Sequence, residues 1–145
     1  MSELELTVTR TIPASREAVF NAWLSPDTLA KFMATPMGGT KPTQVSNDPV
    51  KGGRFSIVMM NGDKEIPHAG TYLEISPHSR LVFTWESPYS LDDSVVTIDL
   101  TEPVPGTTDL SLRHVKFRSV EARDGHRDGW GAIISNLVEE LKEPA

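Results

Sequence analysis

The stretch SVEARDGHRDGWGAIISNLVEELK, residues 119–142, decides the fold because it predicts one long amphipathic helix near the end of the chain. Ser119 is suited to cap its first turn, and the side chains at helical spacing after it share one stripe. The stripe consists of His126, Trp130, Ile133, Ile134, Leu137 and Leu141. A helix over residues 120–142 would be about 35 Å long, enough to cross a sheet whose face buries the stripe.

Because of three glycines in the first half of this segment, the sequence does not decide at which residue the helix begins. Gly125, Gly129 and Gly131 each cost about 1 kcal/mol relative to alanine inside a helix. They can serve close packing or leave open space beside the helix. The alternative is that the helix begins near Asp128 and that the first glycines belong to a loop.

Upstream of the helix, the sequence has the alternating pattern of strands separated by turn residues. Alternating runs occur at 55–59, 70–75, 81–85, 96–100 and 110–114, with turn signals at Asn61-Gly62, 76–79, Ser87-Pro88 and 103–107. Short turns join antiparallel neighbours, so these strands form a meander.

The N-terminal part predicts one strand followed by two short helices. Leu4, Leu6, Val8 and Ile12 lie at even spacing before Pro13. One amphipathic segment follows the capping residue Ser15, and a second follows Ser25-Pro26, which breaks the first helix and starts the next. Their apolar residues are Val19, Phe20, Trp23 and Leu24, then Leu29, Phe32 and Met33. We therefore expect an α+β helix-grip fold: a curved antiparallel sheet wrapped around a long C-terminal helix, as a single domain over residues 1–145.

The composition of the chain argues against several classes of function. The net charge of −6 repels phosphate backbones, so nucleic-acid binding is not expected. No apolar stretch approaches the ~20 residues of a membrane span. The chain has no cysteine, which excludes disulfides, thiolate metal sites and cysteine nucleophiles. Without a signal-peptide pattern at residues 1–12, we expect a cytoplasmic protein.

The predicted inward face mixes large apolar groups with a few polar ones, as small-molecule pockets do. These candidate ligand-binding residues are Phe55, Met59, Phe83, Trp85, Ile98, Leu112, His114, His126 and Trp130. The alternative is that they simply fill the core, with His114 as a structural histidine. No phosphate loop, nucleophile elbow or metal-ligand spacing occurs, so neither a cofactor nor a metal is expected. A histidine could act as acid or base, and the sequence leaves catalysis undecided.

Four stretches together resemble the START-like (SRPBCC, birch-pollen-allergen-like) superfamily. They most resemble the branch named after the C-terminal domain of the activator of the ninety-kilodalton heat-shock protein's ATPase. The stretches are RTIPASREAVFNAW at 10–23, GGRF at 52–55, GTYLEISP at 70–77 with RLVFTW at 80–85, and HRDGW at 126–130. The resemblance implies the helix-grip fold, a cavity between sheet and C-terminal helix, and hydrophobic ligands in many relatives. Phe32-Met33 departs from the Trp-Phe pair that relatives often carry near the cavity mouth.

These observations lead us to expect a cytoplasmic protein that binds a small hydrophobic or aromatic molecule. One alternative is a cyclase-like or hydrolase-like enzyme that uses a cavity histidine. Another is a cochaperone-like interaction module, because the superfamily includes cochaperones as well as carriers and cyclases. The sequence leaves open a homodimer and contact with a chaperone.

Overall fold

The computed structural model describes residues 5–33, 43–61, 64–86, 94–116 and 119–141. Leu4, Gly62 of the predicted turn, and Ser87-Pro88 lie outside these ranges. The elements are β1 (Glu5–Ile12), α1 (Arg16–Ala22), α2 (Pro26–Phe32), β2 (Gln44–Asn47), β3 (Arg54–Asn61), β4 (Lys64–Ser76), β5 (Arg80–Thr84), β6 (Val95–Val104), β7 (Thr107–Val115) and α3 (Val120–Leu141).

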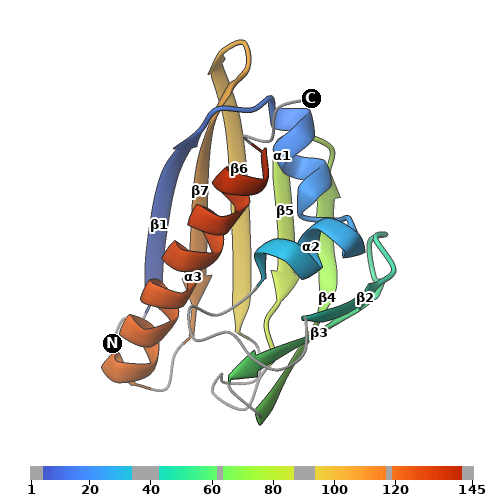
Figure 1. The fold of residues 1–145 in the computed structure, drawn as a ribbon, viewed down its shortest axis with the longest axis vertical. Coiled ribbons are helices and arrows are strands. Elements are labelled where there is room, and N and C mark those ends of the chain that lie inside the picture. The colour runs from blue at the N-terminus through green and yellow to red at the C-terminus, as the bar shows by residue number, and fades with distance from the viewer. Residues whose placement is uncertain (1–4, 34–42, 62–63, 87–93, 117–118, 142–145) are drawn as a thin grey trace.

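All seven strands form one antiparallel sheet in the order β1-β7-β6-β5-β4-β3-β2. The strands from β2 to β7 follow one another as a meander, and β1 pairs with β7 at the far edge. The three helices lie on one face of this curved sheet, with α3 running diagonally across it (Figure 1). The predicted α+β helix-grip architecture is confirmed. Strand β2 was missed because its four residues carry no clear alternation of apolar side chains.

The inward-facing side chains of neighbouring strands lie opposite one another and form buried rows across the sheet. Leu6 lies opposite His114, which lies opposite Val96, which in turn pairs with Phe83. All four side chains are buried. Residues one position along each strand point to the other face, which the helices leave uncovered. The alternation therefore selects which face of the sheet the helices cover.

Serine side chains cap all three described helices, and this was predicted for Ser15 and Ser119. Ser15 Oγ accepts a hydrogen bond from the amide of Ala18 at 3.2 Å, and Ser119 Oγ accepts one from Ala122 at 3.0 Å. Ser25 caps α2 in the same way. Because α3 begins at Val120, its glycines are helical, and the alternative start near Asp128 is wrong.

The buried side of α3 matches most of the predicted stripe. Its buried residues are Trp130, Ile133, Ile134, Leu137 and Val138. His126 and Leu141, at the two ends of the stripe, are only partly buried. The buried residues of α3 therefore all lie between Trp130 and Val138, and the first two turns of the helix contain none.

Candidate functional site

A small cavity lies between the sheet and the α1–α2 pair. Eight apolar or aromatic residues line it: Trp23, Leu29, Met33, Phe55, Ile57, Tyr72, Phe83 and Trp85. They come from the C-caps of α1 and α2, from the middle of α2, from β3, β4 and β5, and from the residue after β5. Its volume is about 10 Å³, roughly the space that one water molecule needs. An organic ligand could therefore enter only if the cavity widened.

Of the nine predicted site residues, three line this cavity: Phe55, Phe83 and Trp85. The other six, which do not line it, are Met59, Ile98, Leu112, His114, His126 and Trp130. All of these six are buried except His126, which is half-buried. No described α3 residue lines the cavity, so it lies beside α2 rather than under the C-terminal helix. The resemblance had implied the latter position.

Sequence reasoning missed five lining residues: Trp23, Leu29, Met33, Ile57 and Tyr72. The sequence carried a signal of burial for four of these five residues. Trp23, Leu29 and Met33 occupy the apolar faces of the two short helices, which must also be buried against the sheet. Ile57 falls in the same alternating run as Phe55.

Trp130 of α3 does not line the cavity but packs against two tryptophans that do. Its ring lies 4.8 Å from that of Trp85 and 6.3 Å from that of Trp23, centroid to centroid. The His68 ring also packs against this cluster, 5.0 Å from the Trp85 ring. Tilted and edge-on aromatic pairs at such distances are favourable. The aromatic residues of the predicted site and of the cavity lining are therefore linked by ring contacts into one cluster.

His114 is fully buried and held by two hydrogen bonds. Its Nδ1 accepts from the indole Nε1–H of Trp130 at 3.0 Å, so the ring proton must sit on Nε2. Nε2–H then donates to Ser94 Oγ at 2.5 Å. Burial, followed by the nearby charge of protonated His126, lowers the pKa of His114 to about 3. His114 is thus a neutral histidine of defined tautomer at physiological pH.

This tautomer decides what the Ser94–His114 pair can do. A serine nucleophile needs a neighbouring lone pair to take its proton. The Nε2 atom that faces Ser94 carries the hydrogen instead, and the lone pair on Nδ1 is engaged by Trp130. The pair is therefore a buried structural network and not an activated nucleophile.

The remaining two histidines of the cluster are also neutral. Burial lowers the pKa of His68 to about 4, against the opposing effect of carbonyls at Ile57 and Ile66. His126 Nδ1–H donates to the Ala122 carbonyl at 2.7 Å, and burial lowers its pKa as well. Its ring meets that of His114 edge-on at 5.3 Å. The aromatic cluster accordingly carries no positive charge near pH 7.

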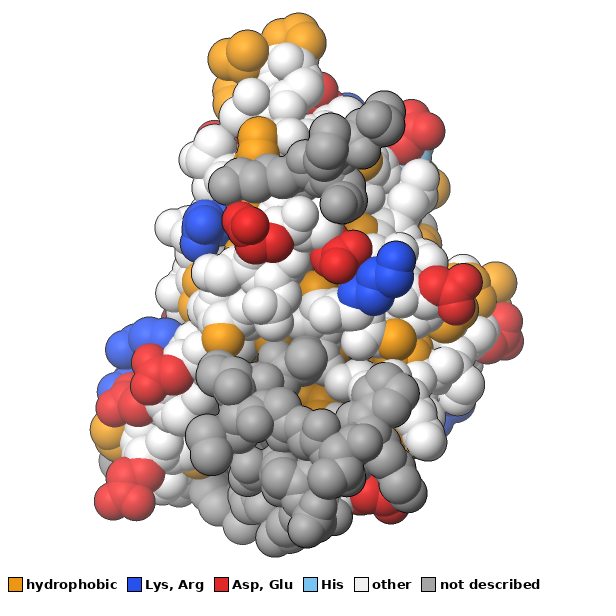
Figure 2. Space-filling view, in the orientation of Figure 1, with side chains coloured by type: hydrophobic (Ala, Val, Ile, Leu, Met, Phe, Trp, Pro, Cys, Tyr) orange, Lys and Arg blue, Asp and Glu red, His pale blue; other side chains and the backbone are white. Residues whose placement is uncertain are grey.

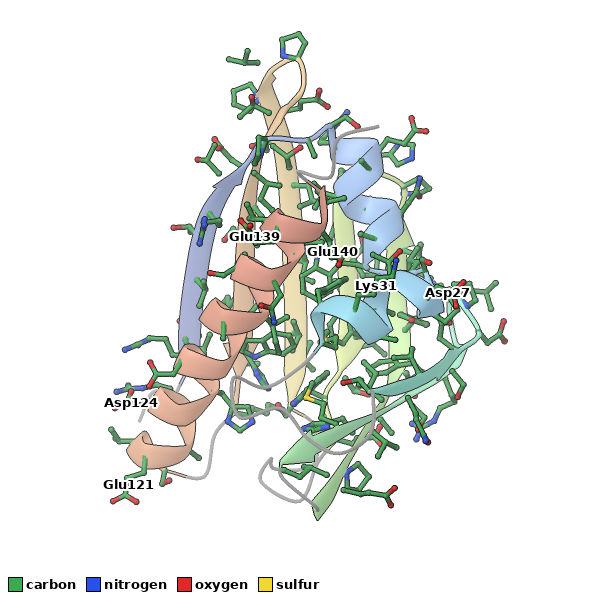
Figure 3. The ribbon with its side chains drawn as sticks, viewed as in Figure 1. Asp27, Lys31, Glu121, Asp124, Glu139 and Glu140 are labelled. Carbon is green, nitrogen blue, oxygen red and sulfur yellow. The ribbon has the colours of Figure 1, made fainter. Side chains whose placement is uncertain are left out.

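No metal centre accompanies this cluster in the described ranges. Among those residues, no three His, Asp or Glu side chains are grouped so that they could hold an ion. The described helices include none with the length and apolar character that crossing a bilayer requires. The charged residues labelled on α2 and α3 in Figure 3 do not line the cavity.

Comparisons with known proteins give one family and many related folds. The family model described as "Activator of Hsp90 ATPase homolog 1-like protein" matches residues 13–142. No curated protein matches the chain. The crystal structure of protein CV1439 from Chromobacterium violaceum is similar, with a TM-score of 0.82, 21% identity, and coverage of 97% of this chain and 99% of that one.

Two further structures illustrate the range of similar proteins. An HSP90 activator from Plasmodium falciparum has a TM-score of 0.77 and 20% identity, covering 97% of this chain and 98% of its own. Protein MLL2253 from Mesorhizobium loti has a TM-score of 0.77 and 25% identity, covering 96% and 97%. Similarity at this level of identity establishes the shared fold.

Proposed function

Because the chain belongs to the activator of Hsp90 ATPase homolog 1-like family, we propose that it binds a small apolar or aromatic molecule beneath α2. Proteins of this fold are known for ligand binding or for Hsp90 cochaperone-like roles. The observation that carries the proposal is the cavity itself, whose eight lining residues include no charged side chain. Pockets for small organic molecules have this mostly apolar lining with a few polar groups.

The molecule can enter only if the cavity widens. The side of the cavity formed by α2 contains a side chain that can adapt its shape. Met33 ends α2 and lines the cavity with a flexible thioether chain. Helix α2 has only seven residues. Outside the helix itself, its C-terminal end is held by the Thr43 hydroxyl, which donates to the Met33 carbonyl, and by Asn136, which donates to the Phe32 carbonyl. Widening would also move Leu29 and Phe32, which are buried, so the ligand has to replace the apolar contacts that these side chains lose.

Catalysis by a cavity histidine has less support. His114 is locked in the tautomer that cannot accept a proton from Ser94, and it does not line the cavity. His68 does not line the cavity either, and its ring is tilted against that of the lining residue Trp85 at 5.0 Å. We therefore propose binding without chemistry at this site.

A cochaperone-like role is the second candidate, favoured by the family's name and by the similar HSP90 activator from Plasmodium falciparum. An interaction surface usually presents a contiguous apolar patch. The exposed large hydrophobic residues among those described are Val50, Leu73, Val104 and Val120. They lie on four separate segments, and on the face shown in Figure 2 apolar side chains appear only in small areas between charged and polar ones. The ligand-binding proposal therefore comes first.

Location and partners follow from the same proposal. The absence of cysteine fits a reducing compartment, and we propose a cytoplasmic site of action. The net charge of −6 makes nucleic acid an unfavourable partner. The small hydrophobic molecule is the partner that the cavity supports.

Thermal melting with a library of apolar and aromatic compounds tests the proposal. A compound present at a hundred times its Kd should stabilise the fold by about 2.7 kcal/mol. This corresponds to a rise of roughly 5–10 °C in the melting midpoint for a domain of this size. Ile57→Phe should fill the cavity and abolish the rise, measured against the variant's own midpoint.

Leu81→Phe is the matched control, because Leu81 is equally buried on β5 and does not line the cavity. This variant should keep the ligand-induced rise. Two results would contradict the proposal: no compound raises the midpoint of the unaltered protein, or both variants respond alike.

A further inference from the structure

We infer that the bound molecule is neutral, mostly apolar, and carries a hydrogen-bond-accepting oxygen, as a ketone or quinone does. This inference rests on the proposed function and specifies its ligand class. It follows from the polar groups among the lining residues, which offer hydrogens and no counter-charge.

The two tryptophans of the cavity carry indole N–H groups without an acceptor. Trp23 Nε1 and Trp85 Nε1 are both buried, and neither has a hydrogen-bond partner among the described residues. The third tryptophan, Trp130, differs, since its Nε1–H donates to His114. Buried indole N–H groups normally find an acceptor. Both unsatisfied ones belong to residues that line the cavity.

Tyr72 adds a third donor to the lining. Its hydroxyl oxygen accepts from Asn47 Nδ2 at 3.1 Å. The Asn47 amide is oriented by its second donation, to the Leu24 carbonyl at 2.8 Å, so Nδ2 and not Oδ1 faces the tyrosine. The phenolic hydrogen of Tyr72 then has no acceptor among the described residues, and burial raises the pKa of the group, so it stays protonated.

The cavity would reject charged ligands. None of its eight lining residues is ionisable at neutral pH, and His68, which packs against Trp85, is held neutral. An ammonium or a carboxylate placed here would be buried without a counter-ion, which is strongly unfavourable. A carbonyl oxygen needs no counter-ion and can accept two of the available hydrogens.

The test uses two probes of the same shape, 1-tetralone and its hydrocarbon counterpart tetralin, followed by NMR of the indole N–H groups. The chain has three tryptophans, so three indole signals are expected. Tetralone should move the signal of Trp23 or Trp85 downfield relative to tetralin, because only tetralone offers an acceptor. The Trp130 signal should respond equally to both probes, and it serves as an internal control because its hydrogen is already bonded.

A variant experiment then measures the hydrogen bond. The tryptophan that responds is replaced by benzothienylalanine, which keeps the fused ring and lacks the N–H. Tetralone should then bind about fivefold more weakly, the size expected for one net hydrogen bond, while the affinity for tetralin stays within about twofold.

The outcomes separate the two proposals. If both probes bind and the indole signals of Trp23 and Trp85 do not distinguish them, the inference is overturned and the apolar binding site stands. Equal weakening of both probes in the variant also overturns it. If neither probe binds at millimolar concentration and no library compound raises the melting midpoint, the proposed function fails, and the inference fails with it.

Discussion

His114 shows how one buried side chain can be fixed by its partners. The Trp130 indole selects its tautomer, and the Ser94 hydroxyl receives its remaining proton. From the sequence, the residue was an inward-facing histidine that could have been a ligand, a base or a core residue. The hydrogen bonds support the structural role, because both ring nitrogens are engaged by residues outside the cavity lining.

Ser94→Ala tests this network at the level of the residue. The change removes the acceptor of the buried His114 Nε2–H, so we expect the free energy of unfolding to fall by about 1–3 kcal/mol. Urea denaturation measures it. Ser111→Ala, on the outward-facing side of β7, should stay within about 0.5 kcal/mol of the unaltered protein. Equal effects of the two substitutions would show that the Ser94–His114 hydrogen bond contributes nothing.

Among the elements, α3 contains glycines that packing does not explain. A Cβ added at Gly129 would meet no atom within 4 Å, and Gly125 and Gly131 are equally open. Close packing therefore does not require these glycines, and the alternative of open space beside the helix is supported. Gly70 in β4 differs, since a Cβ there would overlap the Thr84 carbonyl oxygen and the Phe55 ring.

Replacing Gly129 and Gly70 by alanine should therefore change the free energy of unfolding in opposite directions. Gly129→Ala should stabilise the protein by about 0.5–1 kcal/mol, because alanine loses less backbone entropy in a helix. Gly70→Ala should destabilise it by about 1–3 kcal/mol, because strand backbone and the Phe55 ring would have to move apart. Melting midpoints of both variants provide the comparison. A destabilising Gly129→Ala would mean that the space beside α3 is needed.

For the whole molecule, the buried neutral histidines make stability depend on pH. In the folded state the pKa of His114 is about 3 and that of His68 about 4, mainly because of burial. In the unfolded chain both return to about 6.5. As the pH falls below that value, the unfolded state takes up protons that the folded state does not, so the free energy of unfolding decreases.

We expect a loss of roughly 2–4 kcal/mol between pH 7 and pH 5, from a slope of at most about 1.4 kcal/mol per pH unit for each histidine. Urea denaturation at several pH values measures it. Glu86 and Glu102 also have lowered pKa values, and their loss of stabilisation falls below about pH 4.5, outside this window. His68→Gln should flatten the slope; an unchanged slope would contradict the assignment.

Much of the fold could be predicted because its signals are local. The alternation in β3, β5, β6 and β7 selects the buried face, and serine capping places the starts of all three helices. Strand β2 escaped prediction because a four-residue edge strand forms through pairing with β3 rather than through its own pattern.

The candidate site could be predicted only in part. Alternation identified Phe55, Phe83 and Trp85 as inward-facing, and all three line the cavity. Alternation could not tell which inward residues leave a void between them, since that depends on how α1 and α2 pack onto the sheet. Hence Trp23 and Leu29 were recognised as buried helix residues but not as cavity walls, and only the resemblance associated Met33 with the cavity.

The sequence by itself determined the helices, the antiparallel meander of the longer strands and the face that each of these elements buries, because periodicity and capping act over a few residues. Only the tertiary structure decided which polar groups find partners. Trp130, Trp23 and Trp85 carry the same indole, yet within the described part of the chain only Trp130 meets an acceptor, on a strand sixteen residues away. A hydrogen bond requires two atoms within about 3 Å, and distant segments reach that separation only when the chain has packed.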